Sequence, residues 1–120
     1  MAQGPFGFQN IDFTAGGGPT LVHIGFCKVN NMAVYNHSNT LIVVQLFDLG
    51  RLPIIGTDKP TWQFPVPYAT TADAATNQFC SDFHAGLKCV NGLAYYIATA
   101  ISGNTIATGA AGTMDWELRP

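Results

Sequence analysis

Charged residues are scarce in this chain of 120 amino acids. Lys, Arg, Asp and Glu together make up 10% of the sequence, against about 25% in an ordinary soluble domain. The five Lys and Arg residues are scattered singly, whereas proteins that bind nucleic acid by releasing counterions gather several cations on one face. We therefore expect no nucleic-acid partner. So uncharged a surface predicts that copies of the chain or a partner cover much of it.

Long hydrophobic runs are also missing. The longest aliphatic run, Leu41–Val44, is far shorter than the roughly 20 residues that a membrane-spanning helix needs. The N-terminus lacks the basic and apolar regions of a signal peptide. The sequence thus predicts that the protein has no membrane partner. It also predicts that the protein is made and assembled in a cytoplasm.

Closely spaced cysteine pairs are absent too. Cys27, Cys80 and Cys89 are odd in number and form no CxxC motif,. Together with His84 they could supply four metal ligands, but the close spacing of paired ligands is missing. Free cysteines behave as small apolar residues and are commonly buried. We interpret the three as buried thiols and predict neither a metal nor a cofactor.

No pattern typical of an enzyme stands out. Asp115 and Glu117 are two apart on one face of an expected strand,, but they look like its solvated side rather than carboxylates across a cleft. His23 lies within a strand and is interpreted as a packed or edge-exposed imidazole. A Cys80–His84 nucleophile would need a third group to orient it, and no GxSxG motif occurs. We predict that the protein is not an enzyme and has no catalytic residues.

Short apolar segments with a two-residue period fill most of the chain, as in strands. Two prolines, Pro65 and Pro67, restrict their segment to a sheet edge or a bulge. The one helical candidate, residues 71–78, is too short and polar to be more than a turn. The pattern predicts an all-β fold: a single jelly-roll-like β-sandwich of about seven to eight antiparallel strands over residues 19–120. Strands are expected within residues 21–27, 32–35, 41–47, 61–68, 92–101 and 114–118.

The N-terminal segment, residues 1–18, combines helix-breaking Gly and Pro with large apolar side chains,. Two interpretations remain open. The segment is either a strand packed on its own domain or an arm, hinged at Gly16–Gly18, that docks its aromatic side chains on a neighbouring subunit. In the second case its apolar residues are the interface anchors. These residues are Phe6, Phe8, Ile11 and Phe13.

Aromatic side chains at alternating strand positions allow a sugar-binding platform, because aromatic faces stack on saccharides. Such residues lie more often in a core or a subunit contact, and we favour that interpretation. The residues concerned are Trp62, Phe64, Tyr68, Tyr95, Tyr96 and Trp116.

An ordered set of short motifs carries a resemblance to a known group of proteins. It consists of Ala33–Asn36, the turn Pro53–Pro60 (PIIGTDKP), Phe64–Pro67 (FPVP), Gly86–Leu87 and Gly92–Thr99 (GLAYYIAT). This series resembles small β-sandwich proteins encoded in tailed-bacteriophage genomes. The resemblance implies a part of the virion surface: a capsid cement or decoration protein, or a distal module of a tail spike or fibre. It implies no catalytic residues.

These observations lead to one predicted function and one alternative. We expect a structural virion protein that cements the outer capsid surface, assembled in the host cytoplasm. The expected form is a homotrimer whose partner is the major capsid protein. The alternative is a receptor- or glycan-binding module of a phage tail spike or fibre, with a host glycan as partner.

Overall fold

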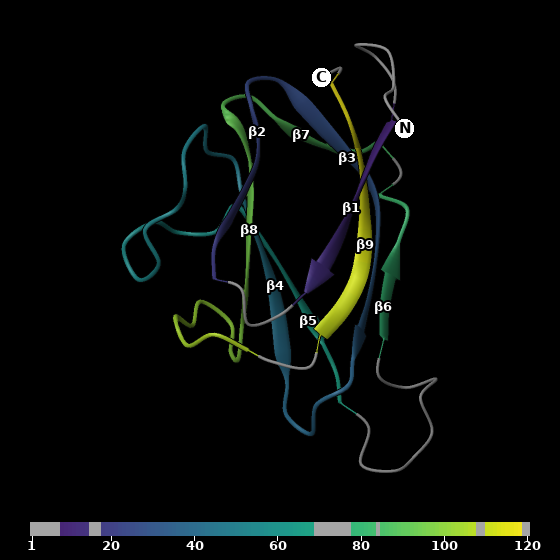
Figure 1. Ribbon diagram of the computed structural model, residues 1–120, viewed down its shortest axis with the longest axis vertical. Helices are drawn as coiled ribbons and strands as arrows, with labels where there is room; N and C mark the ends of the chain where they lie inside the picture. The colour runs from purple at the N-terminus through teal and green to yellow at the C-terminus, as the bar shows by residue number, and fades with distance from the viewer. Residues whose placement is uncertain (1–7, 15–17, 69–77, 84, 108–109, 119–120) are drawn as a thin grey trace.

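The computed structural model describes residues 8–14, 18–68, 78–83, 85–107 and 110–118 (Figure 1). These residues contain nine strands and no helix. The strands are β1 (Phe8–Thr14), β2 (Thr20–Ile24), β3 (Cys27–Asn36), β4 (Ile42–Phe47), β5 (Trp62–Val66), β6 (Gln78–Ser81), β7 (Leu87–Cys89), β8 (Gly92–Ala98) and β9 (Ala110–Glu117).

The strands form two antiparallel sheets that face one another (Figure 1). Sheet A has the order β1-β9-β3-β6, with β7 also paired to β3, and sheet B has the order β2-β8-β4-β5. The first strand pairs with the last, β2 with β8, β3 with β6 and β7, and β4 with β5. This is a long hairpin wound into two sheets, the topology of a jelly roll. The predicted all-β, jelly-roll-like sandwich is confirmed.

Several strand boundaries differ from the sequence prediction, since β3 and β9 are longer than expected and β8 ends at Ala98. The alternating segment 21–27 is broken at Gly25, which has a φ of 104° and donates its N–H to the Asn91 carbonyl at 2.8 Å. The chain turns there because glycine adopts positive φ without a Cβ penalty, and β3 then runs unbroken through residue 36. Strands β6 and β7 were not predicted, since segments of three or four residues are too short to show a period. β5 lies at the edge of sheet B, as Pro65 requires,.

The N-terminal strand β1 pairs with β9 from Phe8 opposite Glu117 to Thr14 opposite Ala111. Residues 8–14 therefore belong to the chain's own sheet A, as in the first of the two interpretations left open by the sequence. The sandwich accordingly begins at Phe8 rather than at residue 19. Residues 1–7 and 15–17, with part of the expected hinge, lie outside the described residues. The turn expected within 71–78 lies outside them as well, apart from Gln78 in β6.

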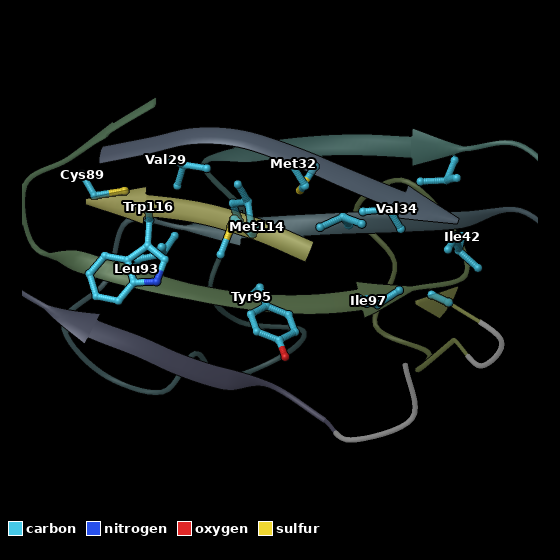
Figure 2. Close-up of a cluster of buried hydrophobic side chains, with 14 of the residues drawn as sticks. Val29, Met32, Val34, Ile42, Cys89, Leu93, Tyr95, Ile97, Met114 and Trp116 are labelled. Carbon is cyan, nitrogen blue, oxygen red and sulfur yellow. The ribbon is translucent and has the colours of Figure 1, made fainter. Parts of the chain in front are cut away.

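The main core lies between the two sheets. Figure 2 shows side chains of β3 and β9 meeting those of β4 and β8, with Val34, Met114, Leu93 and Ile97 among those that are at most 3% exposed. Burial of each such side chain contributes about 1.5–3 kcal/mol relative to its exposure. This core fixes the two sheets and leaves the outer face of sheet B available for other elements.

Candidate functional site

The outer face of sheet B carries a second buried layer. All residues of β4 and β8 are buried, although only alternate residues can face sheet A. Two loops, residues 48–61 and 99–107, lie on the outer side of this sheet (Figure 1). The small cluster beneath them contains Phe47, Ala94, Tyr96 and Ala98, with Leu21, Leu49 and Ile55 packed against it.

The loop 99–107 is tied to the sheet by two glutamine side chains. Gln45, on β4, donates from Nε2 to the Gly103 carbonyl at 3.0 Å. Gln63, on β5, donates from Nε2 to Ser102 Oγ at 3.1 Å, and its Oε1 accepts the Ser102 N–H at 2.5 Å. Ser102 has a φ of 54°, a conformation that is uncommon for a residue other than glycine. The paired hydrogen bonds offset the cost of this conformation and fix the loop.

The loop 48–61 is held from within by Asp58. Its carboxylate accepts two hydrogen bonds from the Arg51 guanidinium, at 2.6 and 2.8 Å, and a third from the Ile54 N–H at 2.7 Å. The bonds from Arg51 and then from Ile54 lower the pKa of Asp58 to about 2. Asp58 thus caps backbone that precedes Gly56 in the PIIGTDKP turn.

The two loops meet each other over the sheet. Gly56 has a φ of 90°, and a Cβ at this position would lie 3.3 Å from Asn104 Nδ2. The hydroxyl of Tyr96, on β8, donates to the Asn104 carbonyl at 3.0 Å from below. Burial raises the pKa of Tyr96, so its hydroxyl remains a donor at neutral pH. Glycine at position 56 therefore lets the loops approach closely.

A pocket of about 400 Å³ lies between these loops, and we call it the loop pocket. Gln45 lines it and is 2% exposed, and among the described residues no hydrogen bond reaches its Oε1. Lys59 also lines it, is exposed, and forms no ion pair within the described ranges. The full lining is Gln45, Phe47, Ile55, Gly56, Thr57, Asp58, Lys59, Pro60, Gln63, Ser102 and Gly103.

A second surface feature lies at the end of the sandwich where β2 turns into β3 and β7 turns into β8, at the top in Figure 1. Ile24 is 66% exposed, and Phe26 and Val90 are each 57% exposed. The hydrogen bond between the two turns, described above, holds them side by side. The Asp48 carboxylate also accepts the N–H groups of residues 90–92 at 2.8–3.3 Å. We call the exposed side chains of Ile24, Phe26 and Val90 the apolar end.

The four predicted anchors fall on and before β1. Phe6 lies outside the described residues. The backbones of Phe8, Ile11 and Phe13 lie on β1, at the edge of sheet A, whereas the loop pocket lies over sheet B. Contact of these residues with a capsid or a neighbouring subunit stays a prediction.

The cysteines divide into two kinds. Cys27 and Cys89 are register partners on β3 and β7, and both are buried free thiols. The hydrogen bond with Cys27, together with burial, raises the pKa of the Cys89 thiol. Cys80 is exposed on β6 at the edge of sheet A, so the prediction of a buried thiol is wrong there. His84 lies outside the described residues, and no group of three metal-ligating side chains occurs among those described.

The paired carboxylates do not share the predicted environment. Glu117 is 5% exposed and forms an ion pair with its register partner Lys28, with Nζ and Oε1 3.0 Å apart. The expectation that it lies on a solvated face is therefore wrong, since the Lys28 side chain covers it. Asp115 is half-buried. His23 is half-buried as well, with its ring centroid 5.0 Å from that of Trp116, which agrees with a packed imidazole.

The aromatic residues form core rather than a platform. Tyr95 and Trp116 are buried in the main core, and Trp62 and Phe64 pack against it. Of the six candidates only Tyr68 is exposed, at 44%. The interpretation as core is confirmed for five of them, counting Tyr96 beneath the loops. A sugar platform of aromatic faces is not what the described surface offers.

Residues 55–60 of the loop pocket lie in the turn that carried the resemblance, but no residue of the pocket was predicted from the sequence as a binding residue. Gln45 gave a signal that could have been used, because it interrupts the apolar run of β4. A polar side chain at the centre of a strand that is buried on both faces needs a partner. Gln63, Lys59 and Ser102 gave no signal, since polar residues in loops and edge strands are ordinary.

Comparison of the chain with protein-family models, with curated proteins and with solved structures finds no match. Among the described residues there is no helix of the length and hydrophobicity needed to cross a membrane. Any function of the protein must therefore be argued from its own surfaces.

Proposed function

We propose that the protein is a structural component of a bacteriophage virion that binds the assembled outer capsid and stabilises it. The observation that carries this proposal is the apolar end on a surface with few charges. Ile24, Phe26 and Val90 are large apolar side chains that are held in place by hydrogen-bonded turns yet exposed to solvent. Exposed apolar clusters with a fixed shape are typical of surfaces that bind a protein partner.

The mechanism is stabilisation by mass action. A protein that binds only the assembled shell stabilises it by about 2.7 kcal/mol per site when its free concentration is a hundred times the dissociation constant. Phe26 is the central candidate for an anchor, because buried aromatic side chains contribute most of the energy of many interfaces. The rigid turns add affinity, since little conformational entropy is lost on binding.

The proposed assembled form is a homotrimer. Three copies would suit the threefold positions of an icosahedral shell, and closed symmetric assembly is usual among oligomers. The apolar residues Phe6, Phe8, Ile11 and Phe13 are proposed to contribute to the contact with the capsid or with the neighbouring copy. Light scattering should give a mass of about three times the 12.8 kDa of one chain, and a monomer at micromolar concentration would contradict this.

Copy number in purified virions tests the proposal directly. Quantitative mass spectrometry should find hundreds of copies per particle, as for a protein that repeats over the shell. A Phe26→Ser variant should fold normally but bind assembled shells at least tenfold more weakly, whereas Leu52→Ser, an exposed side chain in loop 48–61, should bind like the parent. A few copies per particle, or equal binding by Phe26→Ser, would contradict the capsid assignment.

A second function, a receptor- or glycan-binding module of a tail spike or fibre, is favoured by the loop pocket. The loop pocket is a preformed polar cavity that could hold a sugar, whereas the aromatic residues form no sugar-binding platform. A copy number of a few to a few tens per virion would support this function instead. The jelly-roll fold does not separate the two, because the same fold serves capsid and lectin domains.

A further inference from the structure

We propose that the loop pocket binds one acidic saccharide unit, a pyranose ring that carries a carboxylate. The proposal rests on the second function above and specifies its ligand. Its observations come from the pocket alone, and they concern the size, the hydrogen-bonding groups, the apolar surface and the charge of the lining.

The pocket has the size and rigidity of a small-ligand site. Its volume of about 400 Å³ lies within the 300–1,000 Å³ usual for such sites. One wall is fixed by the Gln63–Ser102 pair and the other by the Arg51–Asp58 pair. Because both walls are already held in place, a ligand loses little affinity to ordering them.

The hydrogen-bonding groups of the lining suit a ligand with several hydroxyls. The Gln45 amide is oriented by its bond from Nε2 to Gly103, which leaves Oε1 as a fixed acceptor in a side chain that is 2% exposed. Thr57 and Ser102 add hydroxyl groups, each able to donate and to accept. Gln45 lines the pocket, and a sugar hydroxyl there could donate to its Oε1.

The apolar part of the lining suits a ring rather than a small inorganic anion. Ile55 and Pro60, which are half-buried, contribute carbon surface to the pocket. A pyranose presents a face of C–H groups that would cover this surface, and covering it is favourable because apolar area is removed from water. A phosphate or sulfate ion has no such face.

The charge of the lining favours an acidic sugar over a neutral one. Asp58 is neutralised by its two bonds from Arg51, so it does not repel an anion as a lone carboxylate would. Lys59 then supplies an ammonium group at the pocket without an ion-pair partner among the described residues. A carboxylate on the ligand would complete a charge-assisted hydrogen bond with it.

The test titrates the isolated protein with D-glucuronate and with D-glucose, followed by NMR of the backbone amides. Glucuronate should bind about tenfold more tightly than glucose and should shift the amides of Gly56 and Gly103. Lys59→Gln should abolish this preference, with a loss of about tenfold for glucuronate, the effect expected for a hydrogen bond to a charged group. Lys88→Gln, at an exposed lysine on β7 of sheet A, is the matched control and should change nothing.

A second variant tests recognition of the hydroxyls. Gln45→Met keeps the length of the side chain but removes both Oε1 and the Nε2 bond to Gly103, so it should weaken both sugars by a similar factor. If this variant loses its native spectrum, Lys59→Gln still decides the question, because Lys59 is exposed and its replacement leaves the fold intact. Equal affinity for the two sugars, or no shift in the pocket amides by either, overturns the proposal.

A polymer arm separates this proposal from the function on which it rests. Alginate, a polymer of uronic acids, and neutral dextran are immobilised and offered to the parent protein and to Lys59→Gln. Retention of both proteins on alginate would support glycan binding but overturn the loop pocket as its site. Glucuronate binding in the pocket without retention on either polymer would support the pocket and contradict a glycan receptor. No binding in any arm overturns both.

Discussion

The two faces of sheet B bury their side chains in different ways. Toward sheet A, β4 and β8 present mainly apolar and aromatic side chains, such as Leu46 and Ile97, which pack in the main core. On the opposite face, the same strands present Gln45 and Tyr96 among apolar neighbours, and these two donate to loop carbonyls. The stability of the inner layer comes from the apolar area that it removes from water. The conformation of the outer layer is fixed by a few directed hydrogen bonds.

This difference indicates how the fold separates stability from recognition. An apolar layer tolerates exchange of one hydrocarbon for another when volume is kept, so it specifies the sandwich and little else. Directed bonds select one loop conformation, and that conformation shapes the loop pocket. Loops held on a rigid sheet are where binding residues commonly lie. The outer layer is therefore the part of the molecule whose small changes should alter a site rather than the fold.

The largest expected effect comes from opening the inner layer. Leu46→Ala, at a side chain with no exposure, should lower the free energy of unfolding by about 2–5 kcal/mol, because a cavity is left between the sheets. Urea denaturation followed by tryptophan fluorescence measures this. Leu52→Ala, half exposed in loop 48–61, is the control and should stay within about 0.5 kcal/mol. Similar losses in the two variants would contradict the distinction between layers.

The thiols allow a second comparison of buried and exposed side chains, with a smaller expected loss of stability. Cys27→Ala removes a side chain buried against Cys89 and should cost about 1–3 kcal/mol. Cys80→Ala, exposed on β6, should cost less than about 0.5 kcal/mol. A thiol reagent gives an independent reading, since only Cys80 should react in the native protein. Rapid modification of Cys27 or a large loss of stability on replacing Cys80 would contradict the assignment.

The inner layer was predictable from the sequence, and the outer layer was not. A two-residue period marks which residues of β9 face the core, because Met114 and Trp116 alternate with polar neighbours. In β4 and β8 both faces are buried, so the apolar pattern is continuous and cannot tell which side the loops cover. The close approach of Gly56 to Asn104 brings together residues that are far apart in the chain. Such pairing depends on the winding of the sheets and leaves no local pattern.

The segments that the sequence left undecided were those where glycine and short length hide the pattern. Gly25 breaks an alternation that reads as one strand, and only its hydrogen bond to Asn91 fixes the turn there. The N-terminal residues contain enough glycine and proline for either an arm or a strand, and pairing with β9 determines the conformation of residues 8–14. In both cases the partner strand, rather than the local sequence, determines the outcome.

A single hydroxyl tests whether the outer layer holds its loop. Tyr96→Phe removes the bond to the Asn104 carbonyl and should destabilise loop 99–107 locally by about 0.5–1.5 kcal/mol. Hydrogen exchange should then quicken at Thr99 and Ala107, whose amides bond to Thr105 and Ile97. The central amides of β4 should keep their rates. Tyr35→Phe, at an exposed ring on β3, is the control, and equal changes in both variants would contradict a specific role for Tyr96.

The smallest expected effect is a pH dependence confined to loop 48–61. The bonds from Arg51 and Ile54 hold the pKa of Asp58 at about 2 in the folded protein, whereas an unfolded aspartate titrates near about 3.9. Because the folded pKa is the lower one, Asp58 stabilises the loop above about pH 4, and this contribution is lost as the pH falls through about 2. The Ile54 amide, which donates to the carboxylate, should report the change by NMR with a midpoint near pH 2. Arg51→Gln should move that midpoint up toward 4, and Asp58→Asn should remove the transition.

The amide of Leu46 should not follow the Asp58 titration in any of the three proteins. A midpoint near pH 4 in the parent would show that Arg51 does not hold Asp58 in solution, and that wall of the loop pocket would then lack its fixed shape.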